Sequence, residues 1–206
     1  MPGRTAQNEG ATTATRILDV AEGLLQTRGY NGFSYADIAS ELDVTKAALH
    51  YHFPTKADLG EALVTRYAER FMKALAAIEA GDDDPRAKLD AYADLYAQVL
   101  QGRRMCMCGM LAAEYQTLPE PMRARVLAFF DENVVWLERV LERGRVGGVL
   151  AFRGSAAEAA RLIVDAMEGT MLVSRSYADP ARFRSVAGGL LDGLVGGRPD
   201  AAPTGS

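Results

Sequence analysis

Apolar residues recur along most of the chain at the spacing of an amphipathic helix. The first series consists of Ile17, Val20, Ala21, Leu24 and Leu25. These residues follow one another at i, i+3, i+4, i+7 and i+8, so they share one face of a helix. Val- and Ile-rich stretches that alternate with polar residues, the pattern of a half-buried strand, are missing. The pattern therefore predicts an all-α protein.

Turn and capping residues divide the N-terminal third into one long helix, two short helices and a second long helix. Gly29 suits the left-handed residue that ends a helix. Ser34, followed three residues later by Asp37, is a near-match to a capping box. Thr45 and Thr55 can cap the third and fourth helices. After the first two helices we expect helices at residues 45–52, 56–80, 86–100, 105–117, 121–146, 155–177 and 180–195.

The composition fits a globular protein with a core. Of the 206 residues, 49% are hydrophobic and 24% are charged, which is ordinary for such a domain. The sequence contains no run of about 18 apolar residues, so it predicts no membrane span. The N-terminus also lacks the apolar stretch of a signal peptide. We therefore expect a cytoplasmic protein without a membrane partner. The net charge of −4 argues against coating nucleic acid by charge alone but permits a local basic face.

Two short helices joined by a tight turn and supported by a longer helix form a helix-turn-helix. In such a motif the second short helix lies in the major groove of DNA. Here Leu49 and Phe53 can face the core, while Ala47 and Ala48 permit close approach to thymine methyl groups and Lys46 can reach a guanine or a phosphate. The side chains that we expect at the DNA are Ser34, Tyr35, Thr45, Lys46, Ala47, Ala48, His50, Tyr51, His52, Thr55 and Lys56.

The stretch GYNGFSYADIASELDVTKAALHYHFPTKADL, residues 29–59, closely resembles the DNA-binding domain of the TetR (tetracycline-repressor-like) family of bacterial regulators. The matching positions are Gly29, Gly32, Phe33, Ile38, Ala39, Val44, Lys46, Leu49, Tyr51, His52, Phe53, Lys56 and Leu59. Where this chain has His50, the family often carries an aromatic residue. Further along, CGMLAAE and LERGRVGGVL look like the regulatory domain of one branch of the family.

The resemblance implies an all-helical homodimer that binds a pseudopalindromic operator in double-stranded DNA and is released by a small-molecule effector. It also implies that the dimer forms through the helices near residues 121–146 and 155–177. Repression is the expected outcome of operator binding. Activation is the alternative, because the outcome depends on the position of the operator relative to the promoter. We expect a flexible arm (1–14), a helix-turn-helix DNA-binding domain (15–62), a helical ligand-binding and dimerisation domain (63–196) and a disordered tail (197–206).

Aromatic and methionine side chains gather in the C-terminal part of the chain. Such side chains usually form a core, but they also adapt to varied apolar ligands, which favours a hydrophobic or aromatic effector. Glu114 and Glu168, on otherwise apolar helices, are candidates for polar or cation-recognising groups. The candidate ligand-binding residues are Tyr67, Phe71, Tyr92, Tyr96, Cys106, Met107, Met110, Glu114, Trp136, Glu168 and Met171.

A metal site and an enzyme have little support in the sequence. His50 and His52 are the only histidines, and side chains two residues apart on a helix point about 200° apart. The sequence contains no nucleophile elbow, metal cluster or phosphate-binding glycine loop. We expect no metal, no cofactor and no catalytic residue, and we keep a helical small-molecule enzyme only as an alternative.

A redox-responsive regulator is a further alternative, because Cys106 and Cys108 lie close together in the sequence. On a helix the two side chains diverge, and a bridge between them would strain the backbone. Arg103 and Arg104 could lower the pKa of a thiol if that thiol is exposed. Free cysteine is otherwise a small buried apolar residue.

Overall fold

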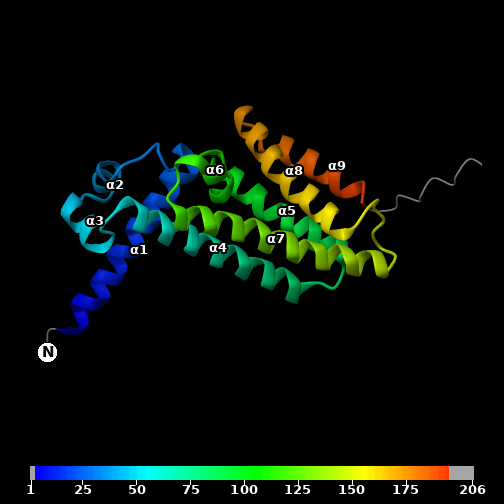
Figure 1. Ribbon diagram of the computed structural model, residues 1–206, viewed down its shortest axis with the longest axis horizontal. Helices are drawn as coiled ribbons and strands as arrows, with labels where there is room; N and C mark the ends of the chain where they lie inside the picture. The colour runs from blue at the N-terminus through cyan, green and yellow to red at the C-terminus, as the bar shows by residue number, and fades with distance from the viewer. Residues whose placement is uncertain (1–2, 195–206) are drawn as a thin grey trace, which may run out of the picture. The chain divides into compact units, whose positions relative to one another are not determined.

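The structure, a computed structural model, describes residues 3–194 and shows helices joined by turns throughout that range (Figure 1). No strand occurs among the described residues, and the all-α prediction is confirmed. The predicted tail at 197–206 lies outside the described residues. The helices are α1 (Gly3–Arg28), α2 (Tyr35–Leu42), α3 (Lys46–His52), α4 (Lys56–Gly81), α5 (Pro85–Gln101), α6 (Met107–Ala113), the 3-10 helix η1 (Tyr115–Thr117), α7 (Glu120–Val146), α8 (Ala156–Ser176) and α9 (Pro180–Asp192).

The chain divides into two compact units, each assembled from separate segments. The first unit comprises the chain up to Arg70 together with Arg104–Leu127, and the second comprises Phe71–Arg103 and the chain from Ala128 onward. Helices α4 and α7 therefore begin in the first unit and end in the second. A division near residue 62, as expected from the sequence, would leave the 104–127 segment out of the first unit.

The core of the first unit explains why α3 is held firmly. Ile17 and Leu25 of α1, Ile38 of α2 and Leu49 of α3 have no exposed surface. Helix α1 packs against α2, and α2 packs against α3. Each fully buried leucine or isoleucine side chain contributes about 1.5–3 kcal/mol relative to an exposed one. The apolar faces read from the sequence are thus the faces that build this core.

Helix α1 begins at Gly3, inside the segment 1–14 for which we expect a flexible arm. The described backbone is helical from Gly3 onward. The segment after Pro2 contains no proline or turn sequence that would stop a helix. Adding residues to an existing helix avoids the cost of nucleation, because each new residue gains one backbone hydrogen bond. The buried part of α1 supplies that nucleus.

The predicted helix at 105–117 is divided in two. Helix α6 ends at Ala113, and η1 follows from Tyr115 to Thr117. Glu114, between them, directs its carboxylate to backbone amides at the end of α1. Gln26 of α1 also donates its side-chain amide to the carbonyl of Met105, at 3.0 Å. These contacts attach the second segment of the first unit to α1.

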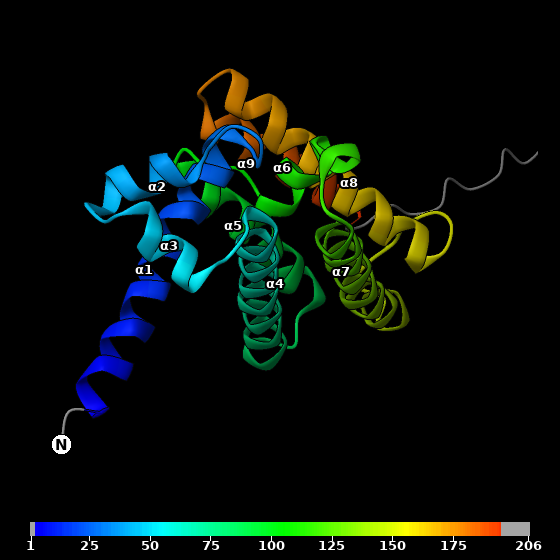
Figure 2. The ribbon, with the colours of Figure 1, turned by 60° about the vertical axis from the view of Figure 1, so that its left-hand side comes forward.

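In the second unit, α5, α8 and α9 lie side by side (Figures 1 and 2). Their shared core contains Leu89 of α5, Met171 of α8 and Phe183 of α9, none of which has exposed surface. Helix α8 begins with a capping box, in which Ser155 donates its backbone N–H to the carboxylate of Glu158 at 2.8 Å. This cap satisfies backbone donors that a helix start leaves without partners.

Candidate nucleic-acid interface and ligand-binding core

Helix α3 presents a row of side chains to solvent from a buried anchor. The hydroxyl oxygen of Thr45 accepts the backbone N–H of Ala48 at 3.3 Å and so caps the helix, as predicted. Leu49 is fully buried, whereas the side chain of Tyr51 is 84% exposed. Of the residues expected at the DNA, Thr45, Lys46, Ala47, His50 and Tyr51 are exposed, and Ala48 and His52 are half-buried.

His50 lies at the end of α3 in contact with its neighbours. Its Nδ1 is 3.0 Å from the carbonyl oxygen of Pro54, and its ring lies 4.7 Å from the ring of Tyr35. These contacts orient the ring and assign Nδ1 to a protein partner. No group of three or more potential metal ligands occurs among the described residues.

Ser34 and Thr55 start α2 and α4 in the same way. The carboxylate of Asp37 accepts the backbone N–H of Ser34 at 2.7 Å and its hydroxyl at 2.6 Å. The carboxylate of Asp58 likewise accepts the backbone N–H of Thr55 at 2.9 Å and its hydroxyl at 2.8 Å. Hydrogen bonds from Ser34 lower the pKa of Asp37. Both predicted DNA contacts therefore lie at helix starts, where backbone N–H groups also face outward.

The structure places Tyr35 differently from the prediction. The residue is only 8% exposed, and its hydroxyl lies 2.7 Å from the carbonyl oxygens of both Phe53 and Thr55. Burial, with a contribution from the charge of Asp58, raises the pKa of Tyr35 to about 12. Tyr35 therefore joins α2 to the turn after α3. The sequence motif alone does not show that the aromatic ring of Tyr35 is buried.

Lys56, which we expect to contact a phosphate, is half-buried and bonds within the protein. Its ammonium donates to the carbonyl oxygen of Phe33 at 2.5 Å and lies 4.7 Å and 4.5 Å from the ring centroids of Tyr30 and Phe33. Burial lowers the pKa of Lys56. The side chain binds the turn before α2 to the start of α4, because cation–π contacts and a charged hydrogen bond hold it there.

Glu114, predicted to bind a ligand, instead holds the turn after α1. Its carboxylate accepts the backbone N–H of Tyr30 at 2.6 Å and that of Asn31 at 3.3 Å. Asn31 also donates its side-chain amide to the hydroxyl of Thr117 at 2.8 Å. Gly29 permits this approach: its φ is +84°, and a Cβ there would lie 2.7 Å from the Glu114 carboxylate. We call these contacts the Glu114 link.

A buried carboxylate joins α1 to the first part of α4. Glu22 accepts a hydrogen bond from Arg66 at 2.8 Å and another from Arg70 at 2.5 Å. Arg66 also pairs with Asp19 at 2.7 Å. Because Glu22 is almost fully buried, loss of either arginine would leave a poorly compensated charge. No pattern in the sequence singles out these residues, because each charge is ordinary on an amphipathic helix.

Four predicted ligand-binding residues lie in the first unit besides Glu114: Tyr67, Cys106, Met107 and Met110. The hydroxyl of Tyr67 lies 3.5 Å from the sulfur of Cys106. The thiols of Cys106 and Cys108 are both buried. The activation by Arg103 or Arg104 that a redox sensor would need depends on an exposed thiol, so the geometry does not favour that alternative.

In the second unit, an aromatic cluster brings together Phe71, Tyr92, Tyr96 and Trp136. The indole of Trp136 stacks on Tyr92 with 5.8 Å between ring centroids, and Phe71 meets both tyrosines edge to face. The Tyr92 and Tyr96 hydroxyls are 3.1 Å apart. The other predicted residues of this unit, Glu168 and Met171, lie on α8, where Met171 is buried and Glu168 is half-buried.

Asn133 is a polar member of this cluster that sequence reasoning missed. Its Oδ1 accepts from the Tyr92 hydroxyl at 3.0 Å, and its Nδ2 donates to the carbonyl oxygen of Phe129 at 2.7 Å. An asparagine between the apolar pairs FF and VV of α7 was the available indication. The Trp136 Nε1 donor is buried without a hydrogen-bond partner. Such a donor costs about 1–3 kcal/mol until an acceptor satisfies it.

Helix α8 carries an exposed apolar stripe. Leu162, Leu172 and Val173 are about half exposed. Gly169 lies among them, and a Cβ at that position would meet no neighbouring atom. On α7, Val135 is similarly exposed. Within residues 3–194, no helix is long and apolar enough to cross a membrane.

Comparisons with known proteins agree with this geometry. The family model described as bacterial regulatory proteins of the tetR family matches residues 17–63. The model described as a tetracyclin repressor-like C-terminal domain matches residues 85–190. Among curated proteins, the HTH-type transcriptional repressor BepR of Brucella suis biovar 1 is 32% identical over 184 residues, which cover 82% of this chain and 83% of BepR.

Solved structures give the same picture. A TetR-family transcriptional regulator from Agrobacterium tumefaciens is 33% identical with a TM-score of 0.88, and the match covers 91% of this chain and 100% of that chain. A TetR transcriptional regulator from Legionella pneumophila is 31% identical with a TM-score of 0.79, covering 87% of this chain and 95% of the other.

Proposed function

The chain belongs to the TetR family of DNA-binding transcriptional regulators, and we propose that it acts as a repressor. In this proposal a homodimer binds a pseudopalindromic operator and leaves it when a small apolar or aromatic effector binds. One observation carries the DNA-binding part: α3 is anchored by buried Leu49 and turns Lys46, Ala47 and Tyr51 to solvent. The name of the related BepR, a transcriptional repressor, supports the direction of regulation.

The exposed side chains of α3 suit different parts of DNA. Lys46 can donate to O6 and N7 of a guanine, and Ala47 can contact a thymine methyl group. Tyr51 and His52 can donate to phosphate oxygens. For His50, the contact of Nδ1 with Pro54 leaves Nε2 as the nitrogen that can reach DNA. Base contacts select the sequence, whereas phosphate contacts fix the position of the helix.

The Glu22 pairs support a route by which an effector could act on α3. Because Arg66 and Arg70 attach α4 to Glu22 of α1, a displacement of α4 carries α1 with it. Helices α2 and α3 follow through the shared core of the first unit. The two sites are then linked by a coupling free energy, typically about 1–3 kcal/mol.

The aromatic cluster of the second unit supports an apolar or aromatic effector. Phe71, Tyr92, Tyr96 and Trp136 offer ring faces and edges against which such a ligand can pack. The buried Trp136 Nε1 donor, which has no protein acceptor, favours an effector that carries a hydrogen-bond acceptor. Binding that satisfies this donor gains affinity beyond apolar contact.

The exposed stripe of α8 supports the dimer. Leu162, Leu172 and Val173 present apolar surface, and the open position at Gly169 permits close approach of a second helix. In a two-fold dimer the same stripe packs against its own copy. We propose α8 with the exposed part of α7 as the interface.

The proposal can be tested with operator sites selected from random DNA by the purified full-length chain. Lys46→Ala should lower the binding free energy for the selected site by about 1–3 kcal/mol and should relax the preference at one base pair. Tyr51→Phe should weaken binding to every sequence alike and leave the salt dependence unchanged, because no charge is removed. Fluorescence anisotropy measures both effects.

Lys73→Ala is a matched control, because Lys73 is an exposed lysine of α4 in the second unit. It should leave the affinity for the selected site unchanged. Wild-type affinity in both Lys46→Ala and Tyr51→Phe would contradict the assignment of α3 as the recognition helix. Failure to select any sequence would contradict the proposal as a whole.

A further inference from the structure

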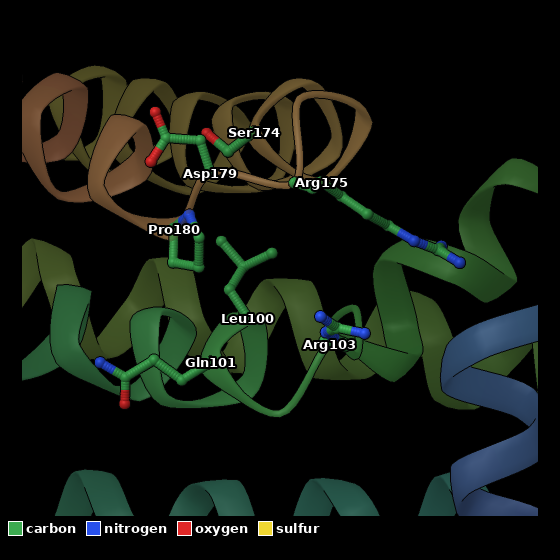
Figure 3. Close-up of a pocket in the computed structure, with 8 residues that line it drawn as sticks. Leu100, Gln101, Arg103, Ser174, Arg175, Asp179 and Pro180 are labelled. Carbon is green, nitrogen blue, oxygen red and sulfur yellow. The ribbon is translucent and has the colours of Figure 1, made fainter.

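The second unit contains a cavity of about 470 Å³ that is separate from the aromatic cluster described above. The cavity lies between the end of α5 and the turn that joins α8 to α9 (Figure 3). Its size is within the range of small-molecule sites, about 300–1,000 Å³. Its lining residues are Leu100, Gln101, Arg103, Ser174, Arg175, Ala178, Asp179 and Pro180.

Two arginines give this cavity its charge. The side chains of Arg103 and Arg175 extend toward the same side in Figure 3, whereas Asp179 and Gln101 lie on the other. The carboxylate of Asp179 points away from Leu100 and accepts the backbone N–H groups of Ala181 and Arg182 at the start of α9. The one acidic group of the lining is therefore committed to capping a helix, and both arginine side chains lie on the side of the cavity away from it.

The backbone on both sides of the cavity is held in an unusual conformation. Arg103 has a φ of +57° and Ala178 a φ of +52°. Helix α8 ends through Ala178, whose N–H donates to the carbonyl of Arg175, while Asp179 donates to the carbonyl of Ser174. Glycine usually occupies such a position. Non-glycine residues in this conformation are strained, and strained residues concentrate at ligand clamps and active sites.

The remaining surface is suited to an apolar body. Leu100 and Pro180 supply hydrocarbon surface between the arginine side and the Asp179 side of the cavity (Figure 3). Ala178 also lines the cavity. Arginine pairs with carboxylates through two parallel hydrogen bonds. We propose that this cavity binds an organic acid, with its carboxylate at Arg103 and Arg175 and its hydrocarbon chain against Leu100 and Pro180.

The test of this site does not depend on the proposed repressor function, because the binding of the acid is measured without DNA. Purified full-length chain is titrated by calorimetry with butanoate, hexanoate, octanoate and decanoate, and with the corresponding neutral amides. We expect at least one acid of the series to bind about tenfold more tightly than its amide, the difference expected for a charged hydrogen-bonding partner of about 1.4 kcal/mol.

Two variants and a control assign the affinity to the cavity. Arg103→Gln and Arg175→Gln should each weaken binding of the acid about tenfold and leave binding of the amide unchanged. Arg139→Gln removes an exposed arginine of α7 outside the cavity lining and should change neither. Circular dichroism melting verifies that all three variants fold.

Equal affinity for acids and amides throughout the series would overturn the proposal. Preferential acid binding that survives both cavity variants would also overturn it, because the anion would then bind elsewhere. If an acid binds at the cavity but leaves operator affinity unchanged, the site stands and its ligand is not the releasing effector. A gel shift with and without the acid tests separately whether the acid releases the protein from its operator.

Discussion

Two side chains of the first unit bond to backbone carbonyls in turns: Tyr35 in the turn after α3, and Lys56 in the turn before α2. Tyr35 reaches the carbonyls of Phe53 and Thr55, and Lys56 reaches that of Phe33. A carbonyl outside a helix needs such a partner when it is removed from water. We therefore expect Tyr35 and Lys56 to affect DNA binding through the stability of the first unit. Their variants should lose stability, whereas variants of Tyr51 should not.

The raised pKa of Tyr35 predicts a loss of stability at alkaline pH. Its folded pKa of about 12 exceeds the ordinary value of 10.0 because burial disfavours the phenolate. The folded state therefore holds this proton more tightly than the unfolded state does. The contribution is complete below pH 10 and is lost as the pH rises toward 12.

This prediction is checked by denaturant unfolding of the wild type and Tyr35→Phe across that pH range. The wild type should be more stable at neutral pH, and the difference should narrow between pH 10 and 12. Ultraviolet titration should show that the phenol absent from the variant is one that ionises near pH 12. A stability difference that stays constant across the range would contradict the assignment.

Lys56→Ala should weaken DNA binding mainly by destabilising the first unit. The substitution removes a charged hydrogen bond to Phe33 and two cation–π contacts, for an expected loss of about 2–4 kcal/mol in the free energy of unfolding. Urea unfolding measures this loss. Tyr51→Phe, which changes a highly exposed side chain, should leave stability unchanged and serves as the comparison. If Lys56→Ala is as stable as the wild type, its effect on DNA binding would instead come from a lost contact between Lys56 and a phosphate.

At the scale of elements, the Glu114 link joins the end of α6 to the turn between α1 and α2. Glu114→Gln keeps the shape of the side chain but removes its charge, so two charge-assisted hydrogen bonds to Tyr30 and Asn31 become weaker. We expect a loss of about 1–2 kcal/mol in the free energy of unfolding. Hydrogen exchange of the Tyr30 and Asn31 amides should become faster.

The control for this change is Glu120→Gln, which alters an exposed glutamate in the first turn of α7. It should leave those two amides as protected as in the wild type. Unchanged exchange in Glu114→Gln would show that the link contributes little to the turn.

The ends of α5 and α8 predict stabilising substitutions. Arg103 and Ala178 occupy the left-handed conformation, which costs a residue with a Cβ about 1–2 kcal/mol. Glycine relieves that strain but loses about 0.5–1 kcal/mol through its greater freedom in the unfolded chain. Ala178→Gly should therefore raise the free energy of unfolding by about 0.5–1 kcal/mol, the difference between these two effects. Ala76→Gly, at an exposed position inside α4, should instead lower it, as a urea titration of both variants would reveal.

At the scale of the whole molecule, the stripe on α8 predicts that dimer formation and operator binding fail together. Leu162→Glu and Leu172→Glu place charges where the apolar surfaces of two copies would meet, which costs several kcal/mol if the charges are buried. Sedimentation should then show monomers with greatly reduced operator affinity. Val149→Glu, in the loop between α7 and α8, is the control. A dimer that persists in both α8 variants would place the interface elsewhere.

Sequence alone predicts the helices and the face of α3 because these depend on spacing and on local caps. Ser34 and Thr45 lie at helix starts and Leu49 is buried, as expected from their neighbours in the chain. The inward positions of Tyr35 and Lys56 were not predictable, because their partners lie 18 to 23 residues away. Glu114 lies 84 residues from Tyr30. An exposed glutamate and one that binds a distant turn look alike in a sequence.

The Glu114 link bears on the construction of hybrid regulators, in which the operator specificity of one protein is joined to the effector response of another. A splice placed after residue 62 would transfer α1, α2 and α3 but leave behind Glu114, Thr117 and Met105, which bind α1 and its turn. The transferred helices would then lack the contacts that hold α1 and the turn after it. A hybrid that also carries residues 104–127 retains both halves of each contact, so the transferable part is two pieces of chain.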